Sequence, residues 1–304
     1  EVKTMLTDMG TILRQAKKEG YGVAAPNAWN LNTVKSIFEA ASELKAPIII
    51  DGAGIHQIEE VSDAVHFYEK KFPEVTAALN EKIKANVAEL EAKGVKPTLG
   101  IIRVGEREDD LSYERGATKR CETLGVAYEK FLLPADVTQE ELMATIDKVN
   151  KDDSIHGVLI FRPLPKHLDE AAVIKALSPE KDVDGITDGS MVGVFAGTKQ
   201  GFPPCTPQAC MEILDHYGID CTGKKAVVVG RSLVVGKPAA MMLLKKNATV
   251  TICHTRTKDM PSVVKEADIV IVAAGRAGVV DDTYLRAGQT VIDVGINVNE
   301  EGKL

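Results

Sequence analysis

The sequence lacks an excess of basic residues, any long apolar run and any tight pair of cysteines. Its 37 Lys and Arg residues stand against 44 Asp and Glu residues, a net charge of −7, and no basic run interrupts that balance. Binding to a nucleic-acid backbone is therefore disfavoured, because phosphate contacts require clustered cations. No stretch approaches the roughly 20 apolar residues that cross a bilayer, and no secretory leader opens the chain. We therefore expect a cytoplasmic protein.

The cysteines are few, odd in number and scattered. They are Cys121, Cys205, Cys210, Cys221 and Cys253. This distribution favours reduced thiols over a disulfide framework. Neither the cysteines nor the six histidines show the paired spacing of a zinc site, so we expect packing residues and no metal.

Helical and strand-like patterns alternate along the 304 residues, a length that suggests two or three domains. This alternation is typical of α/β architecture with parallel sheets. Strands are expected at 98–104, 127–133, 157–160, 226–229, 248–252, 268–273 and 290–294, and helices at 76–93, 113–123, 139–149, 207–217, from 238 and at 262–266. Residues 185–207, rich in Gly and Pro, are predicted as loops that cross between domains. From residue 226 the order is βαβαβ, the doubly wound arrangement that binds ligands at the carboxyl ends of its strands.

The segment GRSLVVGKP, from Gly230 to Pro238, joins an expected strand to an expected helix. A dinucleotide's phosphates require close backbone approach, small residues and free N–H groups at a helix amino end, and this turn supplies all three. Its spacing is not the common G-x-G-x-x-G. A tight turn without a ligand therefore remains an alternative on pattern alone.

The residues after the next strand bear on the choice of cofactor. An NAD-binding domain usually places Asp or Glu there to bind the ribose hydroxyls, whereas this chain has His254-Thr255-Arg256-Thr257. Arg231 and Arg256 can pair with a 2′-phosphate, and Thr255 can donate a hydrogen bond to it. NADP is favoured over NAD, although exposed arginines are often plain surface charges and NAD stays open.

Several ungapped motifs carry a resemblance to a known family. VVVGRSLVVGKPAAMML, ICHTRT, PEKDVDG, PPCTP and VIDVGIN resemble the bifunctional methylenetetrahydrofolate dehydrogenase/cyclohydrolase family, from about Val75 to Leu304. The resemblance implies a tetrahydrofolate-binding catalytic domain over 76–206 and an NADP-binding Rossmann domain over 207–304, with the active site between them. It also implies a homodimer and oxidation of 5,10-methylenetetrahydrofolate to 5,10-methenyltetrahydrofolate, a step of one-carbon metabolism.

The resemblance assigns roles to individual residues. Tyr113 matches the tyrosine that packs against the folate, and Asp184 of PEKDVDG matches the aspartate that holds the pterin ring. Without the family, we would expect a packed core tyrosine and a loop-capping aspartate. The cofactor-binding positions are Gly230, Arg231, Ser232, Thr255, Arg256 and Ile296.

Two departures from the family bear on mechanism. The family's lysine, four residues after the tyrosine, is Ala117 here, and its supporting glutamine is Phe161; Lys119 matches a second basic residue. Hydrolysis of the methenyl group requires water activation and proton transfer, whereas hydride transfer requires mainly alignment. We therefore expect a dehydrogenase whose cyclohydrolase activity is weak or absent. Lys119, taken as a candidate catalytic residue, and Arg115 and Arg162 are the cations that could substitute for the lysine.

Residues 1–75 do not resemble the folate family. GYGVAAPN and a strand at 47–50 resemble the start of a class II fructose-bisphosphate aldolase, but the match stops before the H-x-D-H region that supplies the metal ligand. Because a quarter of a (β/α)₈ barrel cannot close its sheet, we expect no aldolase activity from this segment. We expect a fusion or assembly artefact; a segment docked on the folate domain and a partly disordered segment are the alternatives. The chain ends at Gly302-Lys303-Leu304, before the family's P-G-G-V-G-P-M-T loop, so reduced stability is expected. The alternatives to a dehydrogenase are a non-catalytic folate- and NADP-binding remnant and an aldolase-type lyase.

Overall fold

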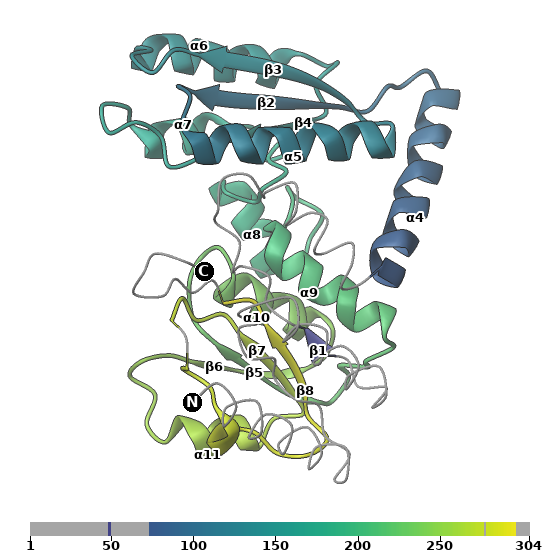
Figure 1. The fold of residues 1–304 in the computed structure, drawn as a ribbon, viewed down its shortest axis with the longest axis vertical. Coiled ribbons are helices and arrows are strands. Elements are labelled where there is room, and N and C mark those ends of the chain that lie inside the picture. Colours follow the sequence, from purple (N-terminus) through teal and green to yellow (C-terminus); the bar gives the residue numbers. More distant parts are fainter. Residues whose placement is uncertain (1–47, 50–72, 277, 296–304) are drawn as a thin grey trace, which may run out of the picture. The chain divides into compact units, whose positions relative to one another are not determined.

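A computed structural model describes residues 48–49, 73–276 and 278–295 and divides the chain into two compact units (Figure 1). The central unit runs to Cys205, and the C-terminal unit begins at Thr206 and also contains Ile48–Ile49. Within these described ranges, no helix combines the length and apolarity of a membrane span. Each unit has its own parallel sheet, which confirms the predicted α/β class.

The central unit is built on three parallel strands in the order β3-β2-β4. Their bounds, β2 Thr98–Val104, β3 Ala127–Leu133 and β4 Gly157–Ile160, coincide with the predicted strands. Around them lie α4 Pro73–Ala92, α5 Glu108–Leu124, α6 Gln139–Lys151 and α7 Glu170–Ala176. The predictions missed α7 and placed the start of α5 five residues late, although acidic residues in its first turn favour a helix amino end.

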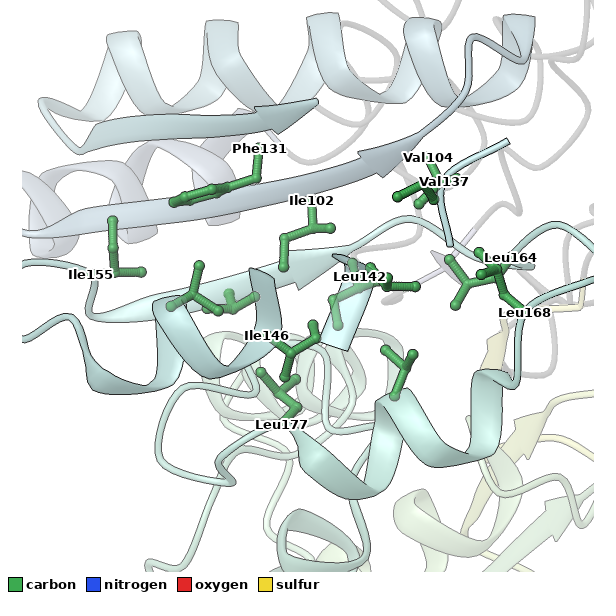
Figure 2. Packing of buried hydrophobic residues seen from close by; sticks show 14 residues of the cluster. Ile102, Val104, Phe131, Val137, Leu142, Ile146, Ile155, Leu164, Leu168 and Leu177 are labelled. Carbon is green, nitrogen blue, oxygen red and sulfur yellow. The ribbon is translucent and has the colours of Figure 1, made fainter. Parts of the chain in front are cut away.

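The two faces of this sheet differ because side chains alternate along each strand. Ile102 and Phe131 point toward α6, where Leu142 and Ile146 recur at helical spacing and are fully buried (Figure 2). A capping box at Thr138 fixes the start of α6. The opposite face of β2 carries Ile101 and Arg103, and α5 covers it through Glu114.

The C-terminal unit has a five-stranded parallel sheet in the order β1-β8-β7-β5-β6. Its main strands are β5 Lys225–Val229, β6 Thr249–Cys253, β7 Ile269–Val272 and β8 Thr290–Asp293. The other elements are α9 Cys205–His216, α10 Gly236–Lys245, α11 Met260–Lys265 and the short 3₁₀ helix η1 Asp282–Tyr284. Because β6 and β7 flank β5 on opposite sides, the strand order switches at the carboxyl end of β5, which is where doubly wound sheets bind ligands.

The edge strand β1 comes from the N-terminal segment. Ile48 and Ile49 pair in parallel with Val291 and Ile292 of β8. These two residues therefore extend the sheet of the C-terminal unit rather than docking on the central unit. The rest of the aldolase-like segment up to residue 72 lies outside the described residues.

The prediction of loops throughout 185–207 is wrong. Helix α8 occupies Asp188–Ala196, and α9 already begins at Cys205. Thr187 caps α8 by accepting a hydrogen bond from the Ser190 N–H at 3.2 Å, and Gly197 ends it with a φ of 67°. The Gly and Pro residues around this short apolar helix hid it from the sequence pattern.

Candidate functional site

In the central unit, aromatic side chains from α5 and from the end of β4 meet. The Tyr113 and Phe161 ring centroids lie 5.8 Å apart, with the ring planes at 81°. Phe161 is buried, whereas Tyr113 is 61% exposed. Tyr113 is therefore not the packed core residue that the pattern favoured: one part of its ring is fixed and the rest is available to a planar ligand.

The two aspartates of PEKDVDG have different surroundings. The fully buried Asp182 carboxylate accepts hydrogen bonds from the N–H groups of Ile186 (3.0 Å) and Thr187 (2.7 Å) and from the Ser190 hydroxyl (2.7 Å). Asp182 is thus the loop cap, a role that the pattern had suggested for Asp184. Asp184 is only partly buried and takes no part in this cap.

A glycine brings Cys205 next to Asp184. Gly185 has a φ of 64°, and a Cβ there would lie 2.5 Å from the backbone N of Pro204, so this contact requires glycine. The Cys205 thiol lies 3.6 Å from the carbonyl oxygen of Val183 and also hydrogen-bonds the Asp184 carboxyl group.

Tyr113, Cys205 and Asp184 differ in the charge that they carry at neutral pH. Desolvation, then the negative charge of Asp184, raises the pKa of Tyr113, and the same causes raise the pKa of Cys205 to about 11. Desolvation also raises the pKa of Asp184, while Arg162 and the Cys205 thiol oppose the rise and Asp182 adds to it. At neutral pH, Tyr113 and Cys205 are therefore protonated, and Asp184 is the titratable group of the cluster suited to carry a negative charge.

Arg162 follows Phe161 and is held by a carboxylate of α7. Its Nη1 lies 3.3 Å from Oε1 of Glu170, and the other oxygen of Glu170 accepts the Leu164 N–H at 2.8 Å. Glu170 thus fixes both the guanidinium and the Pro163-Leu164-Pro165 turn. Sequence reasoning named Arg162 only as one of three cations and did not find Glu170.

The other two candidate cations, Arg115 and Lys119, lie on a different face of helix α5 from Tyr113. Ala117 lies one turn after Tyr113 and is partly buried. Lys119 and Arg115 are exposed, and at six and two residues from Tyr113 they lie about 240° and about 200° round the helix axis from it. The charge of Asp184 therefore acts on Tyr113, whereas Lys119 does not lie on the Tyr113 face of α5.

The residue after Tyr113, Glu114, is the centre of a largely buried ion-pair network. The Glu114 carboxylate accepts a hydrogen bond from Nε of Arg103 at 2.6 Å and pairs with Nζ of Lys130 at 2.8 Å. Arg103 also donates to the Gly105 carbonyl oxygen. Desolvation alone would raise the pKa of Glu114, but hydrogen bonds from Lys130 and Arg103 outweigh it and lower the pKa. The network was missed; its only sequence signal is an acidic residue on the buried face of α5.

In the C-terminal unit, two glycines allow the turn after β5 to close tightly. Gly230 has a φ of 133°, and a Cβ there would lie 2.4 Å from the Ala273 carbonyl oxygen; a Cβ on Gly236 would lie 2.3 Å from the Gly230 carbonyl oxygen. The Ser232 hydroxyl accepts the N–H groups of Val235 (3.1 Å) and Gly236 (3.3 Å) at the start of α10. Bare backbone and a helix amino end at this place fit a dinucleotide's phosphates.

The predicted ribose-binding turn lies at the same edge of the sheet, because Val229 is in register with Cys253. The His254 N–H donates to the Thr257 hydroxyl at 2.8 Å, and Thr255 and Arg256 are exposed. Arg231 and Ser232 are exposed as well. The remaining predicted cofactor residue, Ile296, lies outside the described residues.

A carboxyl group at this edge was not predicted. Asp293 ends β8 and accepts the Gly295 N–H at 2.9 Å. Desolvation raises its pKa, and the Gly295 hydrogen bond opposes the rise. No His, Cys, Asp and Glu side chains in the described ranges gather into a possible metal site.

Comparisons with known proteins match both units. The model for the tetrahydrofolate dehydrogenase/cyclohydrolase catalytic domain matches residues 72–184, and the model for that family's NAD(P)-binding domain matches residues 204–304. Residues 7–88 match the class II fructose-bisphosphate aldolase model.

Individual relatives agree with these matches. The bifunctional protein FolD of Carboxydothermus hydrogenoformans is 55% identical over 73% of this chain and 78% of its own length, and that of Clostridioides difficile is 50% identical over 76% and 80%. Among solved structures, the bifunctional enzyme FolD of Campylobacter jejuni aligns with a TM-score of 0.71 at 38% identity, covering 76% of this chain and 82% of its own. The Trypanosoma brucei enzyme, complexed with NADP cofactor and inhibitor, aligns with a TM-score of 0.67 at 34% identity and covers 76% of this chain and 80% of its own.

Proposed function

The chain belongs to the tetrahydrofolate dehydrogenase/cyclohydrolase family, and we propose that it oxidises 5,10-methylenetetrahydrofolate to 5,10-methenyltetrahydrofolate with NADP. The observation that carries this proposal is the exposed Tyr113 ring, which Phe161 contacts edge to face and whose pKa the negative charge of Asp184 helps to raise. Bound NADP would supply the acceptor for the hydride of the methylene carbon, which leaves a positively charged product.

In the folate half of the site, Tyr113 offers a neutral aromatic platform for the flat pterin ring. Asp184, when ionised, accepts hydrogen bonds from the N–H groups at the edge of that ring. Its negative charge also favours the cationic methenyl product over the neutral substrate. Alignment and charge together are what hydride transfer requires of the protein.

In the cofactor half, the glycine turn and the amino end of α10 would hold the pyrophosphate. Arg231, Arg256 and Thr255 would hold the 2′-phosphate, which would favour NADP over NAD. No acidic residue directly follows β6 to favour the free hydroxyls of NAD.

Hydrolysis of the methenyl product is weak or absent in this proposal. An amine at position 117 would lie one helical turn from Tyr113, but the residue is Ala117, and Phe161 offers no amide partner. The Cys205 thiol, with a pKa of about 11, stays protonated and does not activate water. Asp184 is engaged with the pterin ring. The same two substitutions favour the rival function, a folate- and NADP-binding protein without turnover.

The test mixes the purified chain with methylenetetrahydrofolate and NADP and records NADPH formation. Turnover that Asp184→Asn lowers about tenfold or more supports the proposal, in line with the loss of hydrogen bonds to a charged acceptor. If calorimetry shows binding of both ligands but no NADPH forms, the chain is the binding remnant. We further propose that the active form is a homodimer, which light scattering on the same sample measures.

A further inference from the structure

We infer that Ser190 is a positioning residue of the folate half of this site. Its buried hydroxyl joins the turn 182–187, which contains Asp184, to the segment 200–205, and so sets where the Asp184 carboxyl group lies relative to that segment. The part of this inference that assigns Asp184 to folate rests on the proposed function, whereas the part that concerns the position of Asp184 does not.

The Ser190 hydroxyl is fully buried and uses its whole hydrogen-bonding capacity. It donates to Oδ2 of Asp182 at 2.7 Å, and it accepts the Thr187 hydroxyl at 3.1 Å and the Phe202 N–H at 3.4 Å. A hydroxyl has one donor and two acceptor sites, so all three are occupied. The turn, helix α8 and the segment before α9 therefore meet at one oxygen atom.

Helix α8 and the segment 200–205 pack so closely that side chains are excluded between them. Gly201 has a φ of 62°, and a Cβ there would overlap the Ser190 side chain. A Cβ on Gly193 of α8 would overlap the Gln200 carbonyl oxygen. The segment is thus seated directly on Ser190, and the hydrogen bond to Phe202 is part of an extended contact.

The two neighbours of Asp184 in the chain both touch the segment 200–205. The carbonyl oxygen of Val183 lies 3.6 Å from Sγ of Cys205, and a Cβ on Gly185 would lie 2.5 Å from the backbone N of Pro204. Asp184 lies between these two contacts. Its position relative to Cys205 therefore depends on how the turn meets the segment, which is what the Ser190 hydroxyl controls.

Loss of the hydroxyl should loosen the segment more than the turn. In Ser190→Ala, the Asp182 carboxylate keeps the N–H groups of Ile186 and Thr187, so the turn retains most of its cap. The Phe202 N–H and the Thr187 hydroxyl lose their acceptor inside the protein, and a group left without its partner favours conformations in which water reaches it. The segment and Asp184 should therefore separate while the fold persists.

Cys205 provides a readout of this contact that needs no turnover. It is exposed, whereas the other four cysteines are buried: Cys121, Cys210, Cys221 and Cys253. Only the thiolate reacts with N-ethylmaleimide, and desolvation and the Asp184 charge raise the pKa of Cys205 to about 11, so its labelling at neutral pH is slow. In Ser190→Ala the thiol should be better solvated and farther from Asp184, so labelling of Cys205 should rise at least about fivefold.

The four buried cysteines separate local loosening from general destabilisation. Peptide mass spectrometry of the labelled full chain gives a rate for each thiol, and in Ser190→Ala only Cys205 should react faster. The matched control Thr118→Val removes another buried hydroxyl, which donates to the Glu114 carbonyl oxygen of its own helix at 2.9 Å, and should leave Cys205 unchanged. An unchanged Cys205 in Ser190→Ala, or five thiols that accelerate together, overturns the inference.

A measurement on the wild type keeps the test decisive if Ser190→Ala fails to fold. The N–H groups of Phe202 and Gln200 each donate to a hydroxyl at 3.4 Å, but the acceptor is the buried Ser190 in the first case and the exposed Thr198 in the second. Amide hydrogen exchange should therefore be at least about tenfold slower at Phe202 than at Gln200, after correction for neighbouring residues. Equal corrected rates overturn the inference.

Kinetics test the part that rests on the proposed function. In an active wild type, Ser190→Ala misplaces a binding group, so it should raise the KM for methylenetetrahydrofolate more than it lowers kcat. A lower kcat at an unchanged KM would overturn the link between Ser190 and folate. If the wild type shows no turnover, the proposed function fails, while labelling and hydrogen exchange still decide whether Ser190 positions Asp184.

Discussion

The Tyr113 ring is contacted by the Phe161 ring, edge to face, with centroids 5.8 Å apart. The partner that the family resemblance assigns to this place is a glutamine, whose amide would offer hydrogen bonds where Phe161 offers none. The contact fixes Tyr113 without introducing a polar group beside it. Together with Ala117, it removes the groups that would move a proton and leaves those that bind and orient a planar ligand.

Restoring both polar groups should create hydrolysis. In Ala117→Lys/Phe161→Gln, an amine stands one helical turn from Tyr113 with an amide near it. General acid–base catalysis contributes about 10²–10⁴-fold, so we expect methenyltetrahydrofolate hydrolysis to rise at least about tenfold. The decay of methenyltetrahydrofolate absorbance, corrected for buffer, measures it. Ala117→Met/Phe161→Gln, equal in reach but without the amine, should show no gain; an equal gain in both variants would contradict the argument.

Asp182 and Asp184 should respond oppositely to the same substitution. Asp182→Asn weakens three hydrogen bonds to a buried carboxylate and should lower the free energy of unfolding by about 1.5–3 kcal/mol. The pKa of Asp184 is raised in the folded state, so its contribution favours folding in the protonated form and is lost as pH rises through the folded-state pKa.

At pH 7, therefore, Asp184→Asn should raise Tm slightly while folate affinity falls about ten- to hundredfold. Thermal melts and folate titrations of the two variants provide the comparison. Folate binding by wild type should weaken as pH falls through the pKa of Asp184, and Asp184→Asn should lose this dependence. A lower Tm for both variants would mean that Asp184 is a second structural cap.

Glu114 should matter for stability at neutral pH and lose its effect in acid. Its folded-state pKa is lowered, so its stabilisation is complete above the usual glutamate pKa and disappears as pH falls through the lowered value. Because Arg103 and Lys130 would lose a buried partner, Glu114→Gln should cost about 3 kcal/mol at pH 7 and progressively less below about pH 4.

Urea unfolding at several pH values measures this difference. The control is Asp147→Asn, which breaks the exposed Lys151–Asp147 pair of α6, 2.7 Å apart, and should change stability very little. A pH-independent difference between wild type and Glu114→Gln would show that packing rather than charge is responsible.

Arg256 should discriminate between the two cofactors. If it binds the 2′-phosphate, Arg256→Ala raises the KM for NADP about tenfold or more and leaves the KM for NAD nearly unchanged. Initial rates with each cofactor give the ratio. Lys258→Ala removes a neighbouring exposed charge from the same turn and serves as the control. Equal changes in the KM for NADP and for NAD in Arg256→Ala would mean that Arg256 attracts both cofactors by its charge and does not bind the 2′-phosphate specifically.

The sequence predicted the sheets well because short apolar, β-branched runs bounded by turns seldom form anything other than strands. Strands 98–104, 127–133 and 157–160 were placed without error. Helix α8 was missed because its ends and interior contain glycine, and its cap at Thr187 depends on a loop that Asp182 folds. Local composition does not contain that tertiary contact.

The site shows a similar division. The motif PEKDVDG pointed to the loop that contains both aspartates, but spacing alone could not tell the capping Asp182 from Asp184, because the difference lies in hydrogen bonds to residues four to eight positions later. The helical phase of Lys119 relative to Tyr113 was readable from their six-residue separation. The Arg162–Glu170 pair and the buried Glu114 network depend on how strands and helices meet, which the pattern does not specify.

The most direct measurement follows NADPH and methenyltetrahydrofolate together as the purified chain acts on methylenetetrahydrofolate and NADP. A dehydrogenase that does not hydrolyse its product should accumulate the two in equal amounts, with the methenyl compound decaying no faster than in buffer. NADPH formation without accumulation of methenyltetrahydrofolate would contradict this. Another residue would then be activating water in place of the family's lysine, which is Ala117 in this chain.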